Sequence, residues 1–225
     1  ENKKNMTKTY IEAKLNDGRE IMRVDAPFDD ALSALQEEGI QYPLSTVELA
    51  NARMQFSRSD SLNTNGSYTS EGFLYSKKAQ ALIARISPLV TDSKLAELAV
   101  QANRKGEYFT TDKNLYEQHL AVAEEDKSKS PIERRVIILP SKESFTISQT
   151  ENPEIFAFLF GENGEKYLRH CKRESIDVYT VSSSTVNSQN GTLLTQNWLL
   201  GVGSSSGILG RDWVLGFSLV RGVRS

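Results

Sequence analysis

The chain has 225 residues, of which 38% are hydrophobic and 25% are charged, and its formal net charge is -2. This length and composition allow a packed core, which argues against disorder and fits one large domain or two small ones. The near-neutral charge argues against broad binding to nucleic acid or to a membrane surface. A single cysteine, Cys171, excludes an intrachain disulfide and a multi-cysteine zinc site.

Targeting signals are missing from the sequence pattern. No apolar run approaches the roughly 20 residues that a membrane-spanning helix needs, so no membrane association is expected. Residues 1–5 have no apolar segment behind them and do not read as a secretory signal. Met6 is the expected natural start, with a chain trimmed from a longer precursor as the alternative. We therefore expect a cytoplasmic protein, in keeping with its single cysteine.

The N-terminal half is predicted to begin with a hairpin and to continue with helices. Strands are expected over residues 8–15 and 19–24, because Asn16, Asp17 and Gly18 between them tolerate the positive φ of a tight turn. The polar stretch 57–72 predicts a long loop. Helices are predicted over 27–38, 46–56, 73–87, 93–104 and from 111 or 112 to about 125, on apolar spacing and on local signals: Gly39 as a helix stop, a capping box of Ser45 and Glu48, and Asp92 as a cap.

The C-terminal part follows a charged linker over residues 126–131. The continuous apolar run 135–139 predicts a buried strand. Further strands are expected over 145–147 and 176–181, and a helix, broken near 161–164, over about 152–173. Strand, helix and strand in this order predict a βαβ-like crossover.

Two copies of one tryptophan pattern lie near the C-terminus, at 198–202 and 213–217. The segment between them, 203–211, is rich in glycine and serine, so the pair predicts a terminal β-hairpin. Closely spaced glycines can bring backbone N–H groups to a phosphate. However, no Walker lysine follows them and no helix is expected after them, which favours a purely structural hairpin.

Together these elements predict an α+β (mixed α/β) fold: an N-terminal hairpin, a helical middle, and a C-terminal mixed sheet with the crossover and the terminal hairpin. The linker predicts a hairpin and helical region over 1–126 and an α/β sheet region over 132–225. The alternative is a single domain, in which the N-terminal hairpin joins the C-terminal sheet and the helices form an insertion.

The carboxyl ends of the two expected parallel strands are the candidate ligand site, because open α/β sheets bind ligands there. A lysine flanked by hydroxyls follows the first strand and a hydroxyl cluster follows the second, and together they suit an anion or a polar ligand. Serines also cap helices and fill turns without binding anything. The candidate residues are Ser141, Lys142, Ser144, Ser182, Ser183 and Thr185.

A protein-interaction surface is the second candidate site. Trp198 and Trp213 lie near Arg211 and Arg221 in the sequence, and tryptophan and arginine are enriched at interface hot spots. This surface predicts a homo-oligomer or a protein partner bound through the C-terminal hairpin. The favoured alternative is that both indole rings pack under the sheet.

The sequence gives little support for a metal site, a reactive thiol or nucleic-acid binding. His119 and His170 are not spaced to converge with acidic residues or with Cys171, so no metal or other cofactor is expected. Helix 46–56 carries side chains of the kind that a DNA-recognition helix uses, among them Arg53, yet residues 1–70 are net acidic. A second basic group is expected on one helical face: Lys77, Lys78, Arg85, Arg104 and Lys105.

The function is not fixed by any motif, and none resembles a known family. Because no nucleophile, base and orienting group can be assembled locally, we favour a binding or assembly protein without its own catalysis. An enzyme acting on a phosphorylated or anionic small molecule is the alternative, and a nucleic-acid-binding protein is the third. The enzyme hypothesis requires Ser141, Lys142 and Ser183 to converge on one pocket.

Overall fold

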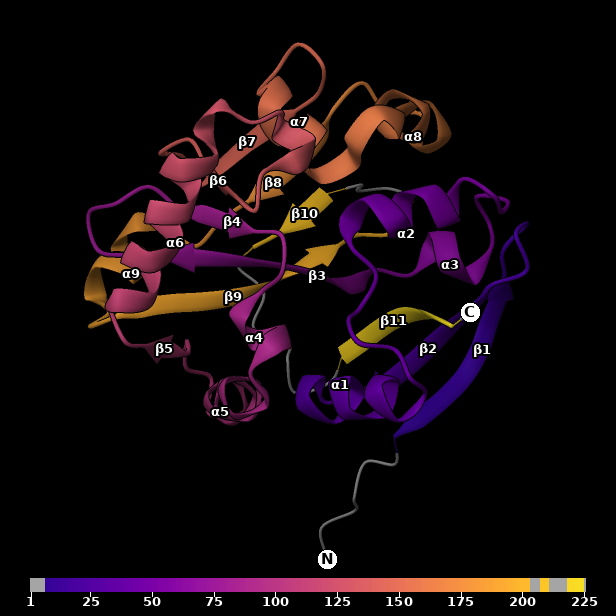
Figure 1. Ribbon diagram of the computed structural model, residues 1–225, viewed down its shortest axis with the longest axis horizontal. Helices are drawn as coiled ribbons and strands as arrows, with labels where there is room; N and C mark the ends of the chain where they lie inside the picture. The colour runs from indigo at the N-terminus through magenta and orange to yellow at the C-terminus, as the bar shows by residue number, and fades with distance from the viewer. Residues whose placement is uncertain (1–6, 203–206, 211–217, 225) are drawn as a thin grey trace, which may run out of the picture.

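A mixed β-sheet with helices on both faces forms the centre of the molecule (Figure 1). The computed structural model describes residues 7–202, 207–210 and 218–224. The main strand order is β1-β2-β11-β3-β9-β10-β8-β7; β4 pairs with β3, β6 with β4, and β5 with β9. The strands are β1 (Lys8–Lys14), β2 (Glu20–Ala26), β3 (Ser67–Tyr75), β4 (Leu82–Ala84), β5 (Thr110–Thr111), β6 (Val136–Ile138), β7 (Ser144–Ile147), β8 (Ile176–Tyr179), β9 (Thr192–Leu199), β10 (Gly207–Leu209) and β11 (Ser218–Arg224).

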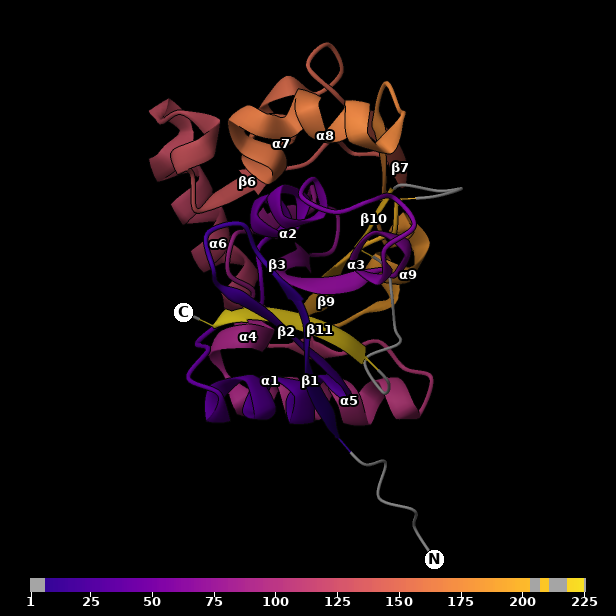
Figure 2. The ribbon, with the colours of Figure 1, turned by 90° about the vertical axis from the view of Figure 1, so that its right-hand side faces the viewer.

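The helices pack on this sheet from two sides, which confirms the predicted α+β fold class. In Figure 2, α1 and α5 lie along one face of the sheet, and α2, α7 and α8 cover the other. The α-helices are α1 (Phe28–Glu37), α2 (Thr46–Arg53), α3 (Ser61–Thr64), α4 (Pro88–Thr91), α5 (Ser93–Arg104), α6 (Asn114–Glu125), α7 (Pro153–Phe160), α8 (Gly164–Cys171) and α9 (Ser183–Ser188). Short 3-10 turns are η1 (Asp126–Ser128), η2 (Pro131–Glu133) and η3 (Gly161–Asn163).

Each face of the sheet has its own apolar core. Phe73 and Tyr75 of β3 pack in the core under α2, α7 and α8, whereas Leu74 packs in the core with α1, α4, α5 and α6. The same alternation appears on β6, where Ile137 belongs to the first core and Val136 to the second. Side chains of successive strand residues point to opposite faces, so one strand serves both cores.

Local signals in the sequence are confirmed where they specify a turn or a cap. The predicted N-terminal hairpin is β1 and β2, and Gly18 at its turn has φ +91°. Ser45 caps α2 in a full capping box with Glu48, and Asp92 caps α5. Gly39 follows α1 with φ +76°, a conformation that glycine adopts freely.

The stretch 57–87 differs from its prediction. Instead of a loop and a helix it contains α3, β3 and β4, and β3 is buried along its whole length. Polar residues of β3, such as Thr69 and Glu71, suggest a loop in the sequence, yet their partners lie on other elements. Long-range hydrogen bonds of this kind leave no local signal.

Strands from both sides of the expected linker enter the sheet. β11 lies between the N-terminal β2 and β3, antiparallel to β2 and parallel to β3. The expected linker itself is built into the fold, because the Asp126 side chain is fully buried and accepts hydrogen bonds from the backbone N–H and side chain of Arg135.

The predicted crossover takes a different connection. β6 and β8 run in the same sense through the ladder but are not hydrogen-bonded to each other. β7 follows β6 and pairs antiparallel with β8, with α7 and α8 in the connection between them.

The first tryptophan pattern contains the end of β9, which pairs antiparallel with β10. The partner expected from the sequence was the second tryptophan pattern. β9 ends at Leu199, and its partner β10 spans residues that were expected in the loop. The second pattern, 213–217, lies outside the described residues.

Candidate functional site

Three strands that run in the same sense end at one hollow, which we call the strand-end pocket. It lies where β3, β6 and β8 end, and it is lined by residues from 75–81, 140–143 and 180–187. Its volume is about 260 Å³. Pockets for drug-sized ligands are about 300–1,000 Å³, so this hollow fits a small group such as one side chain.

Hydrogen bonds between the strand ends shape the pocket. The backbone N–H of Thr180 donates to the carbonyl of Glu143 at 2.9 Å, and the Thr180 hydroxyl donates to the carbonyl of Lys142 at 3.0 Å. The backbone N–H of Ser183 donates to Glu143 Oε1 at 3.1 Å. The Tyr75 hydroxyl donates to the carbonyl of Gly210 at 2.7 Å. Burial raises the pKa of Tyr75, so this hydroxyl stays protonated.

The structure brings three of the six candidate ligand residues into this pocket and gives the others separate places. Ser141, Lys142 and Ser183 line it, as the enzyme hypothesis requires. Ser144 is exposed on β7, opposite Tyr179. Ser182 and Thr185 serve α9 instead: the backbone N–H of Thr185 donates to the Ser182 hydroxyl, which caps the helix.

Two lysines give the pocket its charge. Lys78 and Lys142 line it and are exposed, and among the described residues neither ammonium group forms an ion pair. Glu143 is the one carboxylate in the described lining, and it already accepts from the Ser183 backbone N–H. The lining therefore carries a net positive charge with one carboxylate within it.

Sequence reasoning missed Lys78 and Glu143 as members of this site. The sequence pattern predicts that Lys78 lies in a helix over 73–87. In the structure it lies in the β3–β4 turn with φ +60°, and its backbone N–H donates to Asn187 Oδ1 at 3.0 Å. Open α/β sheets bind ligands beyond the carboxyl ends of their strands, and this carboxyl-end rule selected Lys142. Glu143 is the next residue after the same strand, so the rule points to Glu143 as well.

The candidate interaction surface is not assembled as expected. Trp198 is half-buried and packs edge-to-face on Tyr68, with the ring centroids 4.7 Å apart. Arg221 is fully buried and is therefore not a surface residue. Trp213 and Arg211 lie outside the described residues. Trp198 therefore packs on the sheet, as the favoured alternative to an interaction surface predicts.

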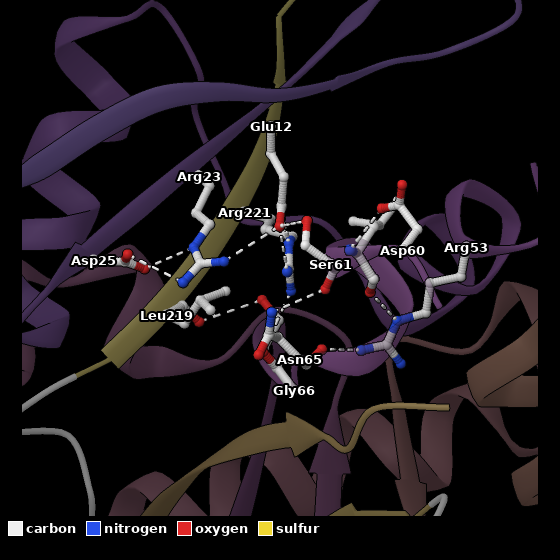
Figure 3. Close-up of polar contacts among 12 residues, drawn as sticks. Glu12, Arg23, Asp25, Arg53, Asp60, Ser61, Asn65, Gly66, Leu219 and Arg221 are labelled. Atoms are coloured by element: carbon white, nitrogen blue, oxygen red, sulfur yellow. Dashed lines mark hydrogen bonds and ion pairs between the residues drawn. The ribbon is translucent and has the colours of Figure 1, made fainter. Parts of the chain in front are cut away.

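Arg221 belongs to a buried ion pair with Glu12 (Figure 3). Glu12 is the extra residue of an irregularity in the β1–β2 pairing, between Ile11 and Ala13. Its carboxylate accepts from Arg221 Nη2 at 2.9 Å, from Arg23 Nη1 at 3.4 Å and from the Ser61 hydroxyl at 2.9 Å. Burial by itself raises the pKa of Glu12, but these contacts outweigh it and hold the pKa below its usual value.

The structure does not place Arg53 of helix 46–56 where it could contact DNA. Arg53, the central basic residue of that helix, is fully buried and donates to the carbonyls of Leu62, Asn65 and Leu200 and to the Tyr167 hydroxyl. The second basic group does not share a helical face either, since Lys77 lies in the β3–β4 turn and Arg85 just after β4.

The histidines and the cysteine lie apart from the pocket. Cys171 is buried at the end of α8, and His170 Nε2 lies 3.1 Å from Asn63 Oδ1. His119 Nδ1 lies 2.9 Å from the carbonyl of Leu115 on its own helix. Within the described ranges, no cluster of three or more His, Cys, Asp or Glu residues is arranged to hold a metal ion. None of the helices in that part of the chain is long and apolar enough to cross a membrane.

Comparison with known proteins gives a structural likeness only. The sequence matches no protein-family model and no curated protein. A solved structure described as "Accommodation of massive sequence variation in Nanoarchaeota by the C-type lectin fold" matches with a TM-score of 0.62 and 12% identity, over 99% of this chain and 100% of that chain. An identity this low informs only on the fold. The chain therefore resembles that solved structure, described as a C-type lectin fold, in its fold alone.

Proposed function

We propose that this chain is a binding protein without catalysis of its own, and that its strand-end pocket receives an acidic group of the ligand. The observation that carries the proposal is the convergence of Lys78 and Lys142 on one small hollow, together with the hydroxyls of Ser141 and Ser183. An ammonium group without a carboxylate partner attracts an anion, and nearby hydroxyls supply hydrogen bonds to its oxygens.

Glu143 limits the kind of anion that fits. Its carboxylate is part of the lining and leaves Lys78 and Lys142 with one net positive charge, which a single carboxylate balances. The small volume fits one carboxyl-bearing side chain. This argument favours an acidic side chain over the phosphorylated small molecule of the enzyme alternative.

The structural neighbour supports a binding role in general terms. It is described as accommodating massive sequence variation in the C-type lectin fold. A fold that tolerates such variation suits a protein whose binding residues change while its core is kept. A cytoplasmic location stays a prediction.

The test is a titration followed by amide NMR with N-acetyl-glutamate and N-acetyl-lysine, both with the α-carboxyl group blocked as an amide, so that each probe carries only the charge of its side chain. We expect N-acetyl-glutamate alone to shift the amide signals of 141–143 and 180–183. Lys142→Ala should abolish these shifts. Lys77→Ala is the matched control, because Lys77 is an exposed neighbour outside the pocket lining.

Three outcomes would overturn the proposal. The first is that both probes leave the pocket signals unchanged, and the second is that Lys142→Ala responds like the wild type. The third is turnover of a phosphorylated probe, p-nitrophenyl phosphate, that Lys142→Ala abolishes, which would favour the enzyme alternative.

A further inference from the structure

A groove runs along the free edge of β6 and adjoins the strand-end pocket; we call it the edge groove. Its volume is about 440 Å³, and its floor is β6 with the residues that follow it. Ala123 of α6 lies on its wall, as does Ile155 of α7. Gln80 and Pro140 line both hollows, so the edge groove continues into the pocket.

The backbone of β6 offers hydrogen-bonding groups to this groove. β6 pairs with β4 in an antiparallel ladder that is flanked by the bonds from Leu139 N–H to the carbonyl of Ala81 and from Arg85 N–H to the carbonyl of Arg135. Hydrogen-bonded positions alternate along such a ladder, so Ile137 faces β4 and the backbone groups of Val136 and Ile138 face outward.

No residue in the described part of the chain hydrogen-bonds the outward backbone groups of Val136 and Ile138. Two N–H and two C=O groups, repeated every second residue, match the spacing of another extended backbone. An unpaired strand edge of this kind is a template for an additional strand.

We propose that the edge groove binds an extended peptide of a partner protein as an added strand on β6, with an acidic residue of that peptide in the strand-end pocket. The peptide's side chains would alternate between the wall that contains Ala123 and the wall that contains Ile155, and small apolar residues suit both walls. The inference rests on the proposed function only for the place of the acidic residue.

Charge at the pocket end of the groove favours an acidic residue in the peptide. Lys142 lies in the adjoining pocket, and no ion pair compensates it within the described residues, whereas Lys127 lines the groove but pairs with Glu124 at 3.4 Å. Arg134 and Glu154 also line the groove but pair with each other at 2.6 Å, so their charges are compensated. The uncompensated charge along the path is therefore positive at the pocket end.

The experiment is a selection of random octapeptides displayed on phage against the full chain, followed by binding measurements with the enriched synthetic peptides. Ile138→Pro removes the outward N–H and leaves the β4-facing bonds of Ile137 and Leu139 in place. We expect it to weaken binding about tenfold or more, since a buried acceptor in the peptide loses its donor. Ile138→Ala is the matched control, because it shortens the same side chain and keeps the N–H.

Hydrogen exchange supplies a measurement that needs no variant. The amides of Val136 and Ile138 should exchange quickly in the free protein and slowly in the complex, because the added strand accepts hydrogen bonds from them. Enriched peptides that leave these amides unprotected and bind Ile138→Pro as tightly as wild type would overturn the inference. So would a selection that enriches no peptide.

Failure of the peptide inference and failure of the proposed function are distinguishable. If peptides do not add to β6 but N-acetyl-glutamate still shifts the pocket signals, the strand addition is wrong and the pocket stands. If Ile138→Pro weakens binding but Lys142→Ala does not, the strand addition stands and the acidic residue in the pocket is wrong.

Discussion

Replacing Glu12 by glutamine should destabilise the protein strongly. Arg23 and Arg221 are directly opposite each other on β2 and β11, an arrangement in which like charges repel. The irregularity in β1 places the Glu12 carboxylate against both guanidinium groups. Glu12→Gln keeps the size of the side chain but removes the charge that compensates Arg221, while Arg23 keeps its pair with Asp25.

The magnitude follows from burial. The side chain of Glu12 is 2% exposed and that of Arg221 is 0% exposed, so water does not replace the lost partner. Breaking a buried pair by removing one partner costs about 3–5 kcal/mol. We expect about 3 kcal/mol at pH 7, since glutamine retains one acceptor oxygen for Arg221.

The loss should also depend on pH. The pKa of folded Glu12 lies below its ordinary value of 4.5, so the ion pair contributes its full stability above that pH. This contribution is lost as the pH falls through the folded pKa, because the carboxylate must then be protonated. Burial lowers the pKa of Arg221 despite Glu12, but a guanidinium stays charged throughout this range. The difference between wild type and Glu12→Gln should therefore shrink in acid.

The assay is urea denaturation followed by circular dichroism at pH 7 and at several lower pH values. Asp17→Asn, which breaks the exposed pair with Arg19, is the matched control and should leave the midpoint unchanged. A double replacement, Glu12→Leu with Arg221→Met, should recover much of the loss. The reasoning would be refuted by a Glu12→Gln loss below about 1 kcal/mol at pH 7 or by a loss that stays constant in acid.

Three further changes test other parts of the structure. Gly66→Ala should lower the free energy of unfolding by about 1–3 kcal/mol, because its Cβ would lie 2.5 Å from the Trp198 indole. Urea denaturation measures the loss, and an unchanged midpoint would contradict this contact. Arg53→Lys should lower the free energy of unfolding by about 2 kcal/mol or more in the same assay, since lysine lacks the planar guanidinium that reaches several carbonyls at once. A loss within error would show that those bonds are dispensable. Burial, followed by the charges of nearby arginines, lowers the pKa of His170 below 6.5, so wild-type stability should fall as the pH drops below 6.5 and the unfolded chain takes up the proton. His170→Gln should flatten this dependence between pH 7 and 5, and an equal slope in both proteins would assign it to other groups.

The sequence predicts elements whose signals are local. The capping box at Ser45 and Glu48, the Asp92 cap and the glycine that ends α1 each act within a few residues, and all three are found in the structure. The carboxyl-end rule also located Ser141, Lys142 and Ser183 at one hollow. That rule needs only the sense of the strands, and β6 and β8 keep the same sense although they are not neighbours.

The sequence does not predict features that depend on distant partners. Arg221 was placed in the candidate interaction surface because arginine is enriched at interface hot spots, and only the position of Glu12 on β1 explains its burial. The edge of β6 depends on strand order, which the hydrophobic pattern does not contain. A site that depends on the order of the strands can therefore be recognised only once the fold is known.

The wrong prediction for the stretch that contains β3 has a specific cause in the centre of the sheet. The pairing of β3 with β9 shifts between Tyr68 and Gly72, and the Gln196 side chain donates to the carbonyls of Thr69 and Glu71 within this shift. A side chain thus replaces backbone partners where the ladder is irregular. A glutamine in that role looks like an ordinary polar residue in the sequence.

The buried carboxylate of Glu71 extends the same argument to α2. It accepts from the backbone N–H of Thr46 at 2.9 Å and from the Thr46 hydroxyl at 3.0 Å. Asn197 Nδ2 donates to the hydroxyls of Thr46 and Thr69 at 2.9 and 2.7 Å. Burial raises the pKa of Glu71 in spite of these bonds, so the charged form of this side chain is disfavoured inside the fold. Because a buried polar group must keep its partners, the network admits one register of β3, β9 and α2, and the polar residues that suggested a loop are those that fix the central strand in place.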